Sequence, residues 1–87
     1  MEGYAYKNLS ASGLVKTGYG EIEGIIVNSH TGGTIKLWDN TSAATTVICN
    51  TITLGASERW VPLFDLCFNT GLYVTIGGTA DITVVYK

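Results

Sequence analysis

Polar and apolar residues alternate along most of this 87-residue chain, in short runs separated by glycines or by polar residues that favour turns. In residues 34–39 (TIKLWD), Ile35 and Leu37 fall on one side of an extended chain, while Lys36 and Trp38 fall on the other. Because successive side chains of a strand point to opposite faces, this two-residue period predicts β-strands. No segment has helical apolar spacing for even three turns. The pattern therefore predicts an all-β protein.

Glycines and polar turn residues set the expected strand boundaries. We expect HTGG (30–33) and GGTA (77–80) to form hairpin turns, because both are rich in turn-forming residues and lie between alternating segments. Gly24 lies inside a strand pattern, which indicates a bulge or a close contact. Residues 65–69 are ambiguous. The predicted strands are residues 4–9, 13–17, 20–29, 34–39, 45–54, 58–64, 72–76 and 81–86.

Seven to eight short antiparallel strands indicate a small β-sandwich or a jelly-roll-like barrel. Residues 1–87 form a single domain, and the sequence leaves open whether residues 1–19 are an irregular N-terminal arm of it. The register on either side of Gly24 is also open, so Ile25 and Val27 are alternatives to Ile22 and Ile26 as inward positions. Those expected inward positions are Ile22, Ile26, Ile35, Leu37, Ile48, Ile52, Leu54, Leu72, Val74, Ile76, Ile82 and Val84.

The composition argues against nucleic acid and membrane as partners. Charged residues make up 14% of the chain, against about 25% in an average domain. The formal net charge is −2 and the five basic residues are scattered, whereas nucleic-acid binding requires clustered lysine and arginine. No apolar run approaches the roughly 18–20 residues that span a bilayer. The first residues lack a secretory signal pattern, so we expect synthesis and assembly in a cytoplasm, or export by another route.

Residue types that carry catalysis are few and widely separated. His30 is the only histidine and is expected as an exposed turn residue, while Glu21 and Glu23 are expected to be solvated. We therefore predict no catalytic, cofactor-binding or metal-binding residue, and we expect that the protein is not an enzyme. Cys49 and Cys67 lack CxxC spacing, which leaves partly buried thiols and a disulfide, within or between chains, as open alternatives.

Three aromatic side chains alternate away from the predicted core. Trp38 lies opposite Ile35 and Leu37, and Trp60 and Tyr73 show the same outward parity in their own strands. Three interpretations of these rings stay open. They pack under loops of the same chain, they contact another subunit, or they form a stacking platform for carbohydrate.

Some strands also carry apolar residues on the side that faces away from the predicted core, which favours contact with another subunit. Val47 and Cys49 fall opposite the inward side of their strand, and Val85 does so in the last strand. A two-layer sandwich needs only one apolar side per strand, so a second side indicates a further covering layer. A chain of this length buries only about 60–65% of its unfolded surface, and another subunit is the most economical source of that layer. The expected interface residues are Trp38, Trp60, Tyr73, Lys36, Arg59, Val47 and Val85, with the two charged residues at the rim.

Three segments, GIIVNSHTGGTIKLWDN (24–40), VICNTITLGASERW (47–60) and TGLYVTIGGTADITVVYK (70–87), resemble small β-rich proteins encoded among the structural genes of tailed bacteriophages. The resemblance covers most of the chain from Gly24 onward and contains no catalytic motif. It implies a virion component made in the host cytoplasm, most simply a decoration (cement) protein that stabilises the capsid as a homotrimer bound to the major capsid protein. The alternative is a tail or fibre component that binds a receptor or carbohydrate.

Overall fold

Six strands form one antiparallel sheet that does not close, in a computed structural model that describes residues 3–87. Within these residues the chain contains strands, bends and turns and no helix, so the all-β prediction is confirmed. The strands are β1 (Ala5–Leu9), β2 (Gly13–Thr17), β3 (Gly20–Trp38), β4 (Val47–Thr53), β5 (Trp60–Phe68) and β6 (Gly71–Tyr86).

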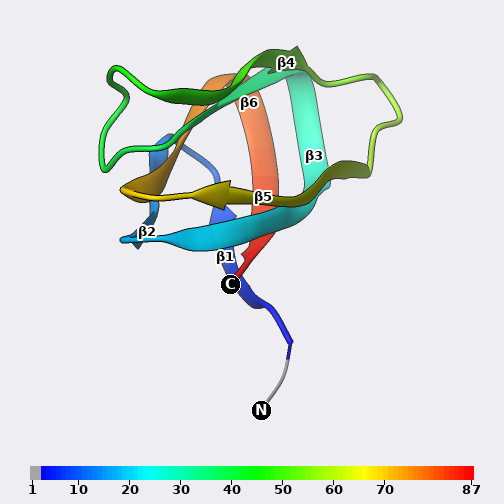
Figure 1. The fold of residues 1–87 in the computed structure, drawn as a ribbon. Coiled ribbons are helices and arrows are strands. Elements are labelled where there is room, and N and C mark those ends of the chain that lie inside the picture. The colour runs from blue at the N-terminus through cyan, green and yellow to red at the C-terminus, as the bar shows by residue number, and fades with distance from the viewer. Residues whose placement is uncertain (1–2) are drawn as a thin grey trace.

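The two long strands, β3 and β6, form the centre of the sheet. They pair with each other from Ile22–Tyr86 at one end to Trp38–Tyr73 at the other. Four short strands flank them, two on each half (Figure 1). In the first half-sheet the order is β5, residues 20–29 of β3, residues 80–86 of β6, and β1. In the second half-sheet it is β4, residues 34–38 of β3, residues 71–77 of β6, and β2.

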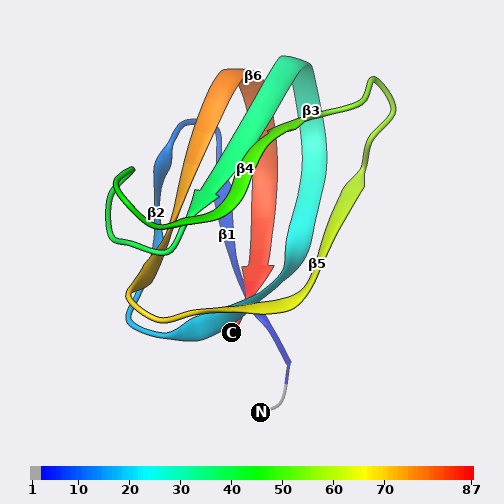
Figure 2. The ribbon, with the colours of Figure 1, turned by 45° about the horizontal axis from the view of Figure 1, so that its top comes forward.

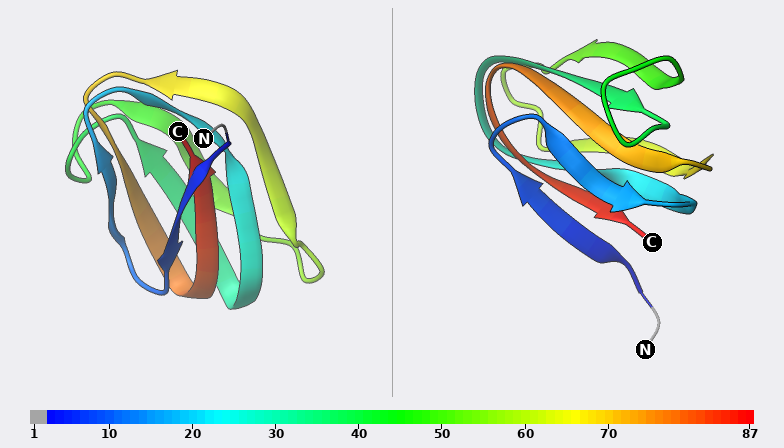
Figure 3. Two further views of the ribbon diagram at one scale, coloured as in Figure 1. Left: turned by 90° about the horizontal axis from the view of Figure 1, so that it is seen from below. Right: turned by 90° about the vertical axis from the view of Figure 1, so that its left-hand side faces the viewer.

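The two expected hairpins are wrong, because HTGG and GGTA lie within continuous strands. The two runs face each other across the central pair, where Thr31 pairs with Thr79 and Thr34 pairs with Gly77. Both strands therefore bend at the same level, and the sheet folds over itself (Figures 2 and 3). This is why six strands are present where seven to eight were expected, since each long strand unites two predicted ones.

The bend requires glycine at particular positions. Gly32 and Gly78 have φ values of 58° and 69°, in the left-handed region that glycine adopts without steric cost. A Cβ on Gly78 would lie 2.6 Å from the carbonyl oxygen of Gly32, which faces it across the pair. A Cβ on Gly32 would meet nothing within 4 Å. Gly78 is therefore needed both for its backbone angle and for close approach, and Gly32 for its angle alone.

The core lies between the two half-sheets. Of the expected inward residues, eight are buried and three are partly buried against the core, but Ile26 is wrong because its side chain is 41% exposed. A bulge between Ile22 and Gly24 reverses the alternation, so Ile22 faces inward before it and Ile25 and Val27 face inward after it. The Gly24 bulge was predicted and is confirmed. Core residues that the pattern did not identify are Leu9, Val15, Val61, Leu63, Phe68 and Ala80.

Two side chains fasten loops to the bent sheet. Asp39 accepts hydrogen bonds from the backbone N–H groups of Asn69 (2.9 Å) and Thr70 (2.8 Å), which lie in the turn between β5 and β6. His30 is half-buried within β3, so the expectation of an exposed turn residue is wrong. Its Nε2–H donates to the carbonyl oxygen of Gly55 (2.7 Å), while its Nδ1 accepts from the N–H of Gly33 (3.3 Å). Both bonds together require the neutral Nε2–H tautomer.

A graded glycine series tests the bend. Gly55→Ala meets only ordinary contacts, so we expect a change within about 0.5 kcal/mol. Gly32→Ala incurs left-handed strain of about 1–2 kcal/mol. Gly78→Ala incurs the same strain plus the clash with Gly32, and we expect the largest loss of the three. Urea unfolding measures the order, and equal losses at Gly32 and Gly78 would contradict the close approach.

Acid should weaken the Asp39 contact. Partial burial acts to raise the pKa of Asp39, but the N–H groups of Thr70, Asn69 and Gly71 outweigh it and hold the pKa below its usual value. Because the pKa of Asp39 is lower in the folded chain than in the unfolded chain, its carboxylate stabilises the fold at pH values above the unfolded pKa of about 3.9. This contribution is lost as the pH falls through the lower pKa of the folded chain. We expect Asp39→Asn to cost about 1 kcal/mol at neutral pH. The difference from wild type should shrink near about pH 2.5, and an equal difference at both pH values would contradict it.

Candidate interaction surfaces

The outward surface of the first half-sheet is largely apolar at its centre. Cross-strand partners share a face, and one row runs from Pro62 through Gly24 and Val85 to Tyr6. The next row pairs Trp60 with Ile26 and Ile26 with Thr83. Figure 3, left, looks toward this half-sheet, with β1, β6, β3 and β5 side by side. We name the surface formed by Trp60, Ile26, Pro62, Val85 and Tyr6 the Trp60 face.

Four of the five side chains of the Trp60 face are exposed and Val85 is half-buried, although the opposite side of the same strands forms the core. Tyr6 is 77% exposed, Trp60 42% and Ile26 41%. Isolated exposed apolar residues are normal on a protein surface, but contiguous ones mark a site of interaction. These residues occupy adjacent positions on neighbouring strands, so they form a contiguous surface rather than isolated exposures.

The indole of Trp60 is held against the backbone of β3. Its ring atoms lie where a Cβ on Gly24 would be, so the ring packs over the missing side chain of that glycine. Glycine inside a strand often marks such a close approach, and the aromatic ring compensates for the packing that glycine lacks. Trp60 is therefore oriented by its own chain while part of its surface stays exposed.

A polar network borders the Trp60 face at one end. The side-chain amides of Asn8 and Asn28 both donate to Asp81 Oδ1, at 2.8 and 3.0 Å, and the amide of Asn28 also reaches Thr83 Oγ1 at 3.1 Å. Hydrogen bonds from Asn8 and then Asn28 lower the pKa of Asp81, because they favour its charged form. The network thus presents an ionised carboxylate and two amides on the outward side of the same half-sheet as Trp60.

The other end of the face is marked by a wide bulge in β5. Ile22 pairs with Leu66 and Gly24 with Pro62, so residues 63–65 lie opposite Glu23 alone. Phe64 and Asp65 adopt φ values of 56° and 58°, which for a bulky residue such as phenylalanine is a true outlier costing about 1–2 kcal/mol. Phe64 is nevertheless 81% exposed, so its ring gains little from packing within the chain.

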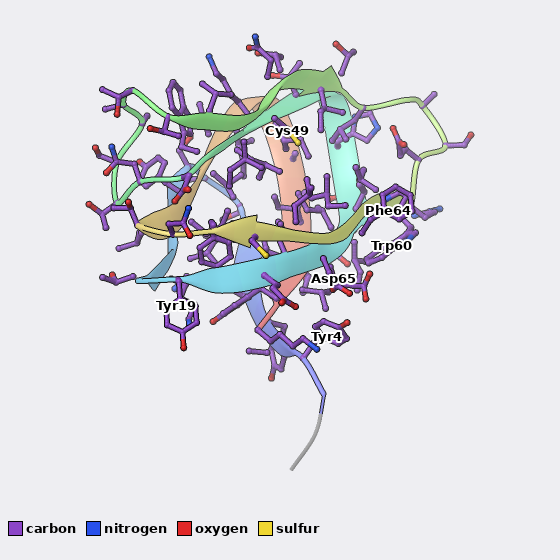
Figure 4. The ribbon with its side chains drawn as sticks, viewed as in Figure 1. Tyr4, Tyr19, Cys49, Trp60, Phe64 and Asp65 are labelled. Carbon is purple, nitrogen blue, oxygen red and sulfur yellow. The ribbon has the colours of Figure 1, made fainter. Side chains whose placement is uncertain are left out.

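Tyr4 links this bulge to the end of β6. Its hydroxyl donates to Asp65 Oδ1 at 3.1 Å (Figure 4). Glu23 and then Asp65 raise the pKa of Tyr4 well above its ordinary value, because a phenolate would face two carboxylates. The ammonium of Lys87 lies 4.7 Å from the centroid of the Tyr4 ring, within the range of a cation–π contact. Tyr4 therefore contacts both the bulge, through Asp65, and Lys87.

Lys87 also lines an open recess of about 610 Å³, where β3 begins and β5 ends. Tyr19 at its edge is 79% exposed, while Phe68 is fully buried. The ammonium of Lys16 donates to the carbonyl oxygen of Tyr19 at 2.8 Å. The residues lining the recess are Lys16, Tyr19, Gly20, Glu21, Cys67, Phe68, Asn69 and Lys87.

Trp38 belongs to the opposite outer surface, on the second half-sheet. It is half-buried, its Nε1–H donates to Thr75 Oγ1 at 2.9 Å, and the ammonium of Lys36 lies 4.4 Å from its ring centroid. Its own chain therefore covers part of this ring. Pairing across β4, β3, β6 and β2 places four apolar side chains in one row, which we name the Trp38 row: Val47, Trp38, Tyr73 and Leu14.

The expected interface residues do not form one site. Four of them, Trp38, Tyr73, Lys36 and Val47, lie on the outward side of the second half-sheet, whereas Trp60 and Val85 lie on the first. Arg59 precedes β5, and its carbonyl oxygen accepts from the N–H of Val27. Their contact with another subunit stays a prediction. Outward apolar residues that the pattern did not single out are Tyr6, Leu14, Tyr19, Ile26, Phe64 and Leu66.

The two cysteines are free thiols in different settings. Cys49 was expected on the outward side of its strand, but it packs partly buried against the core, because register shifts in β4 bring it opposite Leu37. Burial raises the pKa of its thiol. Cys67 is exposed and lines the recess.

Searches for other chemistry and for relatives add no assignment. Among residues 3–87, no group of three or more histidine, cysteine, aspartate or glutamate side chains could hold a metal ion. The same part of the chain contains no helix long and apolar enough to span a membrane. No protein-family model, curated protein or solved structure matches this chain.

Proposed function

We propose that this protein is a non-enzymatic structural protein that assembles with copies of itself through the Trp60 face. One observation carries the proposal: the first half-sheet is apolar on its core side and again, contiguously, on its outer side. Within residues 3–87, no further layer covers that second side. Another copy supplies one at no cost in chain length, and it adds buried area to a small domain whose own core is limited.

The residue types on this face suit an interface. Tryptophan and tyrosine are enriched among the few residues that contribute most binding energy, and charged residues are depleted from interface centres. Trp60 is also pre-oriented by its contact with Gly24, so binding immobilises a ring that already has few alternative positions. The polar network of Asn8, Asn28 and Asp81 lies beside the apolar centre, as the rim of an interface does.

The resemblance to tailed-phage structural proteins supports a virion as the setting of this assembly. In that setting the protein decorates the capsid as a homo-oligomer, for which the resemblance implies a trimer, contacts the major capsid protein and lowers the free energy of the assembled shell without any turnover. We further propose that the bent sheet acts as a two-layer β-sandwich, with the half-sheets as its layers. The inner sides then hold the core, and the outer sides are free for contacts with other subunits.

Two matched valine substitutions test which face associates. Val85→Lys places a charge at the centre of the Trp60 face, and Val47→Lys places one in the Trp38 row. We expect wild type to self-associate in sedimentation-velocity dilution series. Val85→Lys should weaken association at least about tenfold, or about 1.4 kcal/mol, with Val47→Lys near wild type. A wild type that stays monomeric at every concentration would refute the proposal, and a larger effect at Val47 would assign association to the Trp38 row.

Carbohydrate binding at a tail or fibre is the second candidate function. The supporting observation is that the exposed indole of Trp60 and the polar network of Asn8, Asn28 and Asp81 lie on the outward side of the same half-sheet. Sugars are recognised by stacking their C–H face on an aromatic ring while side-chain amides and carboxylates bond their hydroxyl groups. The outward side of the first half-sheet carries both elements, whereas the Trp38 ring is already covered in part by Lys36 and Thr75.

Tryptophan fluorescence distinguishes this second function. A glycan bound on the Trp60 face should change the emission of a Trp38→Phe variant, which retains only Trp60, and should leave a Trp60→Phe variant unchanged. Asp81→Asn should weaken the response, because it removes the charged acceptor. A glycan array without binding, together with self-association of the same sample, would exclude this function and leave the structural proposal standing.

A further inference from the structure

Phe64 adopts a strained backbone conformation, and packing within its own chain does little to offset the cost of that strain. Its φ of 56° places a bulky side chain in the left-handed region, and 81% of that side chain is exposed. Strained residues persist where the surrounding structure fixes them, and they cluster at sites of function. An aromatic ring that is strained and unpacked within the monomer gains its packing only from outside the chain.

The recess beside Lys87 is a complementary receptor for this ring. Its volume of about 610 Å³ exceeds that of a phenylalanine side chain, and the fully buried Phe68 lies in its wall. The charges at the two places are also complementary. Asp65 follows Phe64 in the chain and Glu23 lies opposite the bulge, while Lys16 and Lys87 line the recess together with Glu21.

Resting on the proposed self-assembly, we infer that two copies of this chain pair reciprocally, each inserting Phe64 into the recess of the other. The ring and the recess lie at the same end of the first half-sheet, joined through Asp65, Tyr4 and Lys87. A twofold axis between them matches each ring to the partner's recess, as an isologous contact requires. This contact gives two copies, in place of the trimer that the resemblance implies.

Phe64→Asn separates the two roles of this position. Asparagine tolerates the left-handed region and carries no ring, so at a dilution where wild type is also monomeric the variant should unfold at the same temperature as wild type or higher. Association should weaken at least about thirtyfold, because each pair loses two central aromatic anchors. Sedimentation velocity and thermal unfolding provide the two readouts. An unchanged association constant, or a loss of association that accompanies a loss of monomer stability, would overturn the inference.

A charge exchange tests whether the contact is reciprocal. Asp65→Lys and Lys16→Asp should each weaken homodimers, because lysine then faces lysine, or aspartate faces aspartate, at both contacts. An equimolar mixture of the two variants should restore a species with the mass of two copies. In that mixed pair the two substituted side chains face each other at one contact with opposite charges, and the native Asp65 faces the native Lys16 at the other. Thermal unfolding of each variant alone checks that the monomers fold. A mixture that stays monomeric, or a wild-type mass of three copies, would overturn the reciprocal arrangement.

The outcomes keep this inference apart from the proposed function. If wild type associates and Val85→Lys weakens this association while Phe64→Asn does not, the proposed self-assembly is supported and the Phe64 contact is refuted. If wild type remains monomeric at every concentration, the proposed self-assembly and the Phe64 contact are both refuted. If Val85→Lys, Phe64→Asn and the single charge variants all dissociate the protein and the mixture restores two copies, both the proposed self-assembly and the Phe64 contact are supported.

Discussion

β3 and β6 can enclose a core only because they bend together at one level. A single strand that kinked alone would break the ladder to its neighbour, but here Gly32 and Gly33 lie opposite Gly77 and Gly78, so pairing resumes on both sides of the bend. The long central pair can then contribute to both half-sheets, and residues as distant along β3 as Ile22 and Leu37 meet in one core. The molecule measures 32 by 31 by 18 Å along its principal axes. The four short strands extend this arrangement by pairing with one of the two long strands.

Folding one sheet over itself also determines which surfaces remain for other contacts. Each half-sheet has one side in the core, so the apolar residues of the paired strands that face outward lie on the outer side of one half-sheet or the other. On the second half-sheet the chain partly covers its tryptophan with Lys36 and Thr75. On the first half-sheet Trp60 is instead supported from beneath by Gly24, which leaves part of its surface free. Two tryptophans with the same outward parity in sequence therefore have different surroundings, and the difference arises from their neighbours across the strands.

The alternation of residues predicted the strands and most of the core, because burial of every second side chain is a local property of each strand. It failed at the glycine pairs, since HTGG and GGTA have the composition of hairpin turns and only their pairing with each other makes them bends. It also failed at Ile26, where the bulge reverses the parity, although Gly24 signalled the bulge itself. The interface prediction identified the outward parity of Trp38 and Trp60 but could not divide them between two surfaces, because that depends on how the sheet folds. Nothing in the run ERWVPLFD indicated that Phe64 would adopt a left-handed conformation, which is imposed by the pairing of β5 with β3.

The bulge in β5 shows how an edge strand can carry a contact site without becoming a site of uncontrolled pairing. An exposed edge offers unpaired backbone groups to any other strand, and bulges, proline and charge are the usual protections. β5 has all three near its middle: Pro62, the left-handed pair Phe64 and Asp65, and the carboxylate of Asp65 itself. The same distortion that interrupts a regular edge also projects the Phe64 ring into solvent beside two carboxylates. In the proposed pair, association through the Phe64 side chain replaces association through the backbone. A side-chain contact needs a recess of matching shape and charge, whereas backbone pairing accepts almost any extended chain, so the strain at Phe64 favours specific pairing over aggregation.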